Sequence, residues 1–285
     1  MIQLQPATLL LQVAVGGLGF MWITTRRREA GLGYGWLLRG IFGPLAAASA
    51  LVGFATNPVA VRDIAATATA LAALAALGVS VLRRKAGVSG QRERVERRSA
   101  AIAEITGIER AEQRFDQTRP EFPPVLDLIA PAVGLIGLVA GGLAAGDPAT
   151  LAVARTVIGA LFLGAITDAM LLGHWYLVQP GLARGPLLEL VRWTGLLWLP
   201  ELVVMLWPTG MASVLSGTID DGYNGLLGWF WVACVITTAG LVALARAALK
   251  ERFYSAVMAA TGLLYLGILT GFGMDLVARV LLDTT

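Results

Sequence analysis

Residues 151–178 read LAVARTVIGALFLGAITDAMLLGHWYLV, an apolar run interrupted by Arg155, Asp168 and the single histidine, His174. A helix that crosses the roughly 30 Å hydrocarbon core of a bilayer needs about 20 apolar residues, and this run is longer. Ionisable side chains are costly inside a membrane, so each of these three groups needs a partner, water or a function. The stretch therefore predicts a transmembrane helix that carries candidate functional residues.

The overall composition is that of a membrane protein. The 285 residues are 56% hydrophobic and 14% charged, with a mean hydropathy of +0.71, whereas soluble domains carry about 25% charged residues. The 34 glycines suit close helix packing in lipid. A single cysteine, Cys234, excludes a disulfide framework and a thiolate metal cluster within the chain. We expect one all-α transmembrane domain over residues 1–285, with no metal site.

Eight apolar runs are long enough to cross a bilayer. They cover residues 7–25, 37–55, 64–82, 126–145, 151–178, 187–207, 226–248 and 254–282. Lysine and arginine accumulate on the cytoplasmic side of membrane proteins. With eight crossings, only Arg62, Arg155 and Arg279 of the 22 basic residues fall on the opposite side. The sequence therefore predicts an eight-helix polytopic bundle with both termini non-cytoplasmic, and its alanine, glycine and arginine bias suggests a bacterial-type plasma (inner) membrane.

One substantial polar segment, residues 83–124, separates the third and fourth runs. Within it, residues 92–114 are rich in charge, and Val95, Ile102 and Ile105 recur at helical spacing. This pattern predicts a cytoplasmic amphipathic helix. The helix could dock a partner protein or an anionic leaflet, or it could be a charged connector folded against the inner helix ends.

Depth in the membrane follows from position along a helix, at about 1.5 Å per residue. By this measure the outer half of the membrane contains Arg155, Glu201, Asp275 and Arg279. Asp275 and Arg279 are four residues apart and share a helix face, whereas Arg155 and Glu201 lie on consecutive helices. The four predict either two ion pairs that clamp the bundle or a functional cluster that water reaches. Pro200 removes a backbone hydrogen bond beside Glu201. Prolines within membrane helices occur both beside cavities and in helices without a cavity.

A second layer of polar groups, nearer the cytoplasmic side, contains Asp168 and the consecutive residues His174, Trp175 and Tyr176. Asp168 and His174 are six residues apart, about 240° around a helix, so we expect no direct pair between them. His174 could bind haem, bind a quinone headgroup or relay a proton, or be a helix-end residue in the aromatic belt. A membrane b-type haem needs two axial ligands and the chain has one histidine, so the sequence favours quinone over haem and requires neither.

Two functional hypotheses follow. The first is a non-catalytic or quinone-contacting subunit of a larger membrane assembly, such as a redox complex, with protein partners docked on residues 83–124. The second is a proton-coupled transporter or proton path that uses Glu201 and Asp275 above Asp168 and His174. The chain lacks a phosphate-binding GxxxxGK[ST] loop and the HExxH zinc motif. We therefore assign no catalytic residue and expect the lipid bilayer, and no nucleic acid, as a partner.

Overall fold

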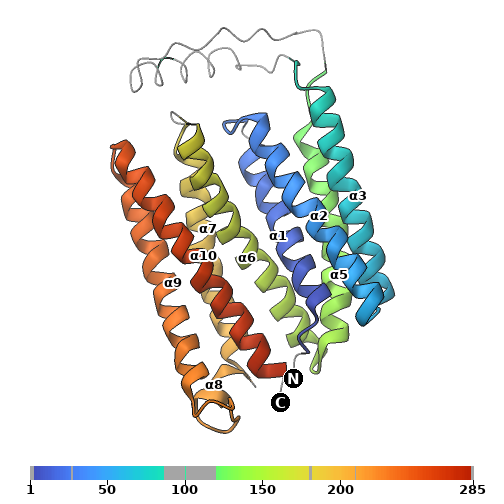
Figure 1. Ribbon diagram of the computed structural model, residues 1–285, viewed down its shortest axis with the longest axis vertical. Helices are drawn as coiled ribbons and strands as arrows, with labels where there is room; N and C mark the ends of the chain where they lie inside the picture. The colour runs from blue at the N-terminus through green and yellow to red at the C-terminus, as the bar shows by residue number, and fades with distance from the viewer. Residues whose placement is uncertain are drawn as a thin grey trace.

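The computed structural model describes residues 3–26, 28–86, 100, 120–179, 182–208 and 210–283. These residues form an all-helical bundle (Figure 1). Its elements are α1 (Pro6–Thr25), α2 (Leu32–Thr56), α3 (Ala60–Leu82), η1 (Pro124–Leu128), α5 (Ile129–Ala145), α6 (Ala149–Val178), α7 (Gly185–Leu206), α8 (Met211–Leu215), α9 (Leu226–Lys250) and α10 (Tyr254–Asp283). The predicted amphipathic helix at 92–114 lies outside the described residues, apart from residue 100.

The long helices form two groups of four that share one packing order. In the first group, α1, α2, α3 and α5 each pack on the next, and α5 returns to α1. In the second group, α6, α7, α9 and α10 do the same, and α10 returns to α6. The groups meet where α6 packs on α1 and α5, near the centre of the bundle (Figure 1). The two groups therefore share one packing order, although their sequences show no repeat.

Seven helices are long and apolar enough to cross a membrane. The set contains every predicted span except the sixth, which corresponds to the 22-residue helix α7. Helix α7 contains Glu189, Arg192 and Glu201, so it is less apolar than its neighbours, but it packs between α6 and α9 within the second group. The chain is thus an integral membrane protein by the length and composition of its helices.

Both ends of the chain lie at one end of the bundle, which we call the terminal end (Figure 1). The Leu4 N–H donates to the Asp283 carboxylate at 2.9 Å, and the Gln3 N–H donates to the Ala145 carbonyl at 2.6 Å. The opposite end, which carries Arg26 and Arg184, is called the basic end.

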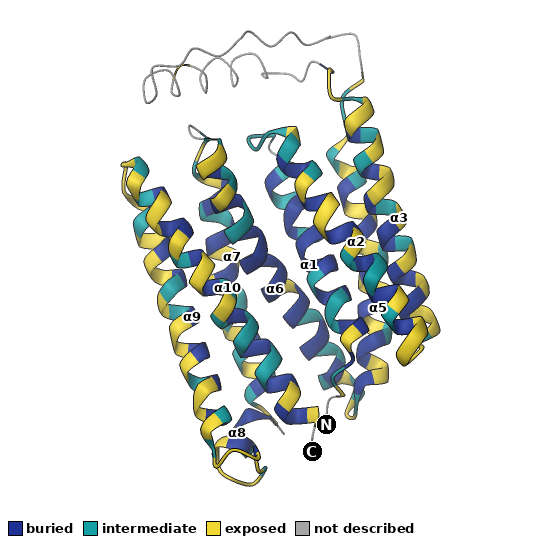
Figure 2. Cartoon of the chain, viewed as in Figure 1, coloured by how far each residue is buried: buried dark blue, intermediate teal, exposed yellow. Residues whose placement is uncertain are grey.

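Glycine permits the closest helix crossing, between α1 and α6. A Cβ atom added to Gly16 would collide with the backbone of Ala160, and one added to Gly164 would collide with the backbone of Gly16. The two helices thus approach backbone to backbone. As Figure 2 shows, α6 is buried along much of its length, whereas α9 is exposed along one whole side. Exposed apolar side chains such as Ile236 of α9 and Leu269 of α10 lie on the outside of the bundle, as lipid contact requires.

The connection before α9 is organised by Asp221. One carboxylate oxygen accepts the N–H groups of Tyr223 and Gly225 at 2.9 and 2.8 Å, and the other accepts those of Leu227 and Gly228 at 2.9 and 3.3 Å. Desolvation acts to raise the pKa of Asp221, but the four amides together lower it below its ordinary value. The ionised carboxylate thereby satisfies amides at the start of α9, which have no partner within the helix.

Candidate functional site

Buried polar side chains from four helices meet near the terminal end. We call this group the terminal cluster, and its members are Gln12 from α1, Arg155 from α6, Glu201 from α7, and Asp275 and Arg279 from α10. All five are buried. The structure therefore brings together the four charged residues that the depth argument placed in the outer half, and adds a glutamine from the first half of the chain.

The strongest contact in the terminal cluster is the pair between Arg279 and Asp275. Arg279 Nε donates to Asp275 Oδ2 at 2.8 Å and Arg279 Nη2 donates to Asp275 Oδ1 at 2.9 Å. The same Nη2 also donates to the Arg155 carbonyl at 2.9 Å. This two-pronged pair between residues four apart on α10 is well matched in geometry, and the bond to the Arg155 carbonyl joins α10 to α6.

Gly159 makes the space in which these groups meet. A Cβ atom at this position would lie 2.7 Å from Arg279 Nη2, 2.7 Å from Gln12 Nε2 and 2.8 Å from Asp275 Oδ1. Gln12 Nε2 instead donates to the Thr156 carbonyl at 2.9 Å. A single glycine among 34 carries no signal in the sequence, so its role emerges only from the packing.

Glu201 is the acid of the terminal cluster that lacks a hydrogen-bond donor among the described residues. Its side chain is 0% exposed, and neither carboxylate oxygen has a hydrogen-bond partner among the described residues. Its charged neighbours are Asp275, Arg279 and Arg155. Arg155 Nε donates to the Val204 carbonyl of α7 at 2.6 Å, and Arg155 is a charged neighbour of Glu201 without donating a hydrogen bond to it. An acid is thus held beside another acid, in a place where an uncompensated charge is costly.

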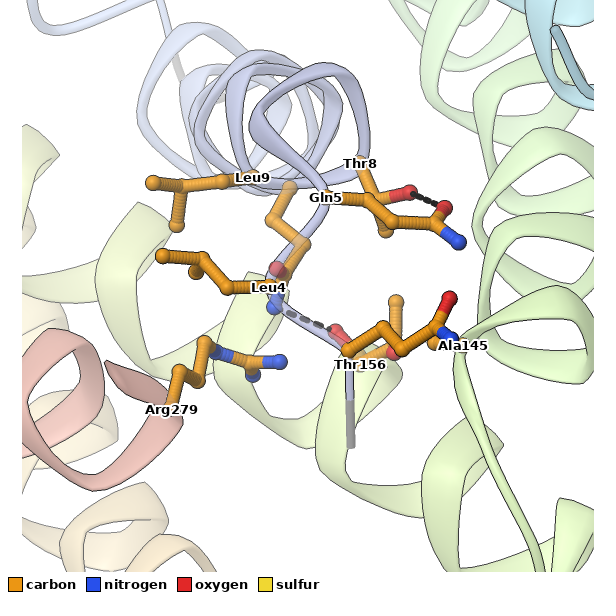
Figure 3. Close-up of a pocket in the computed structure, with 9 residues that line it drawn as sticks. Leu4, Gln5, Thr8, Leu9, Ala145, Thr156 and Arg279 are labelled. Carbon is orange, nitrogen blue, oxygen red and sulfur yellow. Dashed lines mark hydrogen bonds between the residues drawn. The ribbon is translucent and has the colours of Figure 1, made fainter. Parts of the chain in front are cut away.

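A small pocket of about 10 Å³ opens beside the terminal cluster (Figure 3). It is lined by Leu4, Gln12, Thr156 and Arg279, among others, and lies next to the N-terminal segment. In Figure 3 the Arg279 guanidinium reaches toward Leu4 and Thr156. A volume of this size holds roughly one water molecule. The pocket therefore leaves room for about one water molecule beside Arg279, which is paired with Asp275.

Asp168 lies apart from the terminal cluster. It is 0% exposed, and both of its carboxylate oxygens lack a hydrogen-bond partner in the described part of the chain. The Tyr34 hydroxyl from α2 lies 3.4 Å from the Asp168 main-chain carbonyl. Asp168 is nine residues beyond Gly159, about half a turn around α6 and about 14 Å along it. The two sites therefore occupy opposite faces of α6.

The predicted group His174, Trp175 and Tyr176 does not form one site. His174 is exposed, and its Nδ1 lies 3.0 Å from the Tyr265 hydroxyl of α10. The Trp175 ring packs against Tyr34, with ring centroids 6.0 Å apart. Tyr176 is buried and donates to a main-chain carbonyl in the connection to α7. His174 thus shares no face with Asp168, and its partner is a tyrosine that the sequence analysis did not single out.

Two further buried ion pairs lie in the first half of the chain. Arg39 donates to Asp127 through three contacts of 2.6 to 2.9 Å, with 3% and 0% of the two side chains exposed. Arg62 and Asp63 are paired at 2.7 Å, and Gln5 accepts a further bond from Arg62. The pairing of Arg39 with Asp127 joins residues far apart in the chain, so only the fold could assign it. Asp63 and Asp127 are thus both paired, whereas Asp168 and Glu201 have no hydrogen-bond partner among the described residues.

Comparisons with known proteins add no functional assignment. No protein-family model matches the chain, and neither the curated proteins nor the solved structures compared with it include a match. Within the described ranges, no three of its histidine, cysteine, aspartate and glutamate side chains gather in a way that could hold a metal ion.

Proposed function

We propose that the chain is a proton-coupled transporter or proton path, and that Glu201, beside Asp275, is its central proton-binding group. The observation that carries the proposal is the burial of Glu201 without a hydrogen-bond donor next to a second carboxyl group. A proton taken up by Glu201 removes its charge and supplies a hydrogen for a bond between the two carboxyls. Intramembrane acids of this kind are typical of proton relays.

Access to this group comes from the terminal end. The small pocket reaches Gln12 and Arg279. Arg279 is paired with Asp275, and both are charged neighbours of Glu201. Asp168, on the opposite face of α6, is a second proton-binding group of the same path. The two acids are then reached from different sides of α6, so transfer between them requires a rearrangement around this helix.

The proton path also implies an orientation of the bundle in the membrane. We propose that α7 also crosses the membrane, which makes eight crossings, and that the terminal end is the non-cytoplasmic side of a bacterial-type inner membrane. The positive-inside rule supports this orientation because most of the 22 basic residues then face the cytoplasm. Reporter fusions after Arg184 and after Asp283 test it, since the two positions must report opposite compartments.

The test of function is proton flux in proteoliposomes that contain the purified chain. Glu201→Gln keeps the size of the side chain and removes the proton-binding group, so flux should fall at least about tenfold. Asp168→Asn should also reduce flux. The matched control is Glu251→Gln, which removes an exposed acid outside the helices and should leave flux unchanged. Unaltered flux in a correctly folded Glu201→Gln protein would refute the proposal.

A second candidate is a quinone-contacting subunit of a larger membrane assembly, with partner proteins docked on residues 83–124. The exposed pair of His174 and Tyr265 supports it, because a ring nitrogen and a hydroxyl 3.0 Å apart can exchange hydrogen bonds with a quinone carbonyl at the surface of the bundle. His174→Leu should weaken binding of a short-chain quinone about tenfold, whereas Tyr254→Phe, at the start of α10, should not. Equal affinities, or isolation of the chain as a monodisperse species without other subunits, argue against this candidate.

A further inference from the structure

Helices α7 and α9 run antiparallel, and two contacts set their register. Trp198 Nε1 of α7 donates to the Val235 carbonyl of α9 at 3.1 Å. Nearer the basic end, a Cβ atom added to Gly195 would lie 3.5 Å from Val242 Cγ1. Gly195 is exposed, so the seam between the two helices is open to the surroundings at this height.

Basic side chains border this seam on the side of the basic end. Arg192 is three residues from Gly195 on α7, and Arg246 is four residues from Val242 on α9. With about 100° and 1.5 Å per residue, both lie within about 60° of the contact line and about 5 Å beyond it. Lys250 follows one turn after Arg246 on the same flank. The two helices thus bring three cations to one edge.

Among the described residues, these cations have no acidic partner. All three side chains are exposed, and none makes an ion pair with another described residue. The acid of α7 at this height, Glu189, is bound by Arg26 of the first group at 2.7 Å. Like charges on adjacent helices repel each other, so a bound anion would stabilise this edge.

An apolar strip continues the cationic edge toward the middle of the bundle. Leu196 and Leu199 lie four and seven residues from Arg192 on the same face of α7, and they are 54% and 56% exposed. Val203 extends the strip and is 52% exposed. Cations at a helix end followed by an exposed apolar strip match a lipid, which has an anionic headgroup above its acyl chains. A free phosphate would use the cations alone.

We propose that Arg192, Arg246 and Lys250, at the seam of α7 and α9, bind the headgroup of an anionic phospholipid. Each basic side chain near a headgroup contributes modestly, and two guanidiniums together strengthen binding by about tenfold or more. The site lies on the outer surface of the second group, away from the terminal cluster. It is independent of the proposed proton path, because α7 and α9 carry it whether or not Glu201 binds protons.

The test measures lipid retention by the full-length chain in mild detergent, with phosphatidylglycerol and phosphatidylcholine as probes and native mass spectrometry as the readout. The double variant R192Q/R246Q should retain phosphatidylglycerol at least about tenfold less well than the parent, with phosphatidylcholine unchanged. The matched control is R84Q/K85Q, which removes two exposed charges after α3 and should retain phosphatidylglycerol as the parent does.

Three outcomes would overturn the assignment. Equal retention by the parent and R192Q/R246Q removes the site, and an equal loss in R84Q/K85Q attributes retention to total charge. Displacement of phosphatidylglycerol by an equal concentration of inorganic phosphate identifies a free-anion site instead of a lipid site. A melting temperature and elution profile equal to the parent's ensure that R192Q/R246Q is folded, and R192K/R246K, which keeps both charges, should recover most of the retention.

Discussion

We expect the buried ion pair between Arg39 and Asp127 to contribute strongly to the free energy of unfolding. The guanidinium donates through three contacts of 2.6 to 2.9 Å to a carboxylate whose other donor among the described residues is Thr25, at 3.2 Å. Arg39→Gln therefore leaves a buried carboxylate almost without donors. Removal of one partner of a buried pair costs about 3–5 kcal/mol, and the low end applies here because unfolded chains in a membrane find other partners.

The two residues should be strongly coupled. Arg39→Gln and Asp127→Asn should each lower the free energy of unfolding by about 3 kcal/mol, whereas the double variant should lose about 3–4 kcal/mol because neither charge is then left alone. The assay is equilibrium unfolding of the purified chain in mixed micelles with an increasing fraction of dodecyl sulfate. Arg84→Gln, an exposed arginine, should change stability by less than about 0.5 kcal/mol. A coupling energy below about 0.5 kcal/mol would refute the reasoning.

Two further predictions concern the terminal cluster and the loop before α9. Gly159→Ala places a Cβ atom 2.7–2.8 Å from three polar atoms and should destabilise the protein by about 1–3 kcal/mol. Gly262→Ala, whose Cβ meets nothing within 4 Å, should be neutral or stabilising in the same unfolding assay. Because the folded-state pKa of Asp221 is lowered, its contribution to stability is complete above the ordinary carboxyl pKa of about 3.9 and is lost as pH falls through the lowered value. Amide exchange at residues 223–228, corrected for its intrinsic pH dependence, should therefore accelerate only in acid. Asp221→Ala should accelerate this exchange at neutral pH. Exchange at the parent's rate in Asp221→Ala at neutral pH would contradict this role.

The candidate site was only partly predictable from the sequence. Charged residues in apolar runs stand out, and depth along a helix follows from counting, so Arg155, Glu201, Asp275 and Arg279 could be grouped in advance. Gln12 could not, because a glutamine near the start of a span has no charge to draw attention. The sequence also did not predict which residues of adjacent helices are in contact, because the rotation of one helix relative to the next depends on side-chain packing.

The sequence by itself determined that the chain is a helical membrane protein, and it determined where nearly all of its helices run. Both properties are local, since an apolar run of sufficient length must form a helix to satisfy its backbone in lipid. Tertiary structure alone decided which charges from different helical elements are paired and which buried acids lack a partner among the described residues. Arg39 meets Asp127 across 88 positions of the chain, and Gly159 opens the space for the terminal cluster. Asp168 and Glu201 have no donor in the part of the chain that the structure describes. The physical reason is that a hydrogen bond needs donor and acceptor within about 3 Å, and such proximity between distant residues arises only when the helices pack.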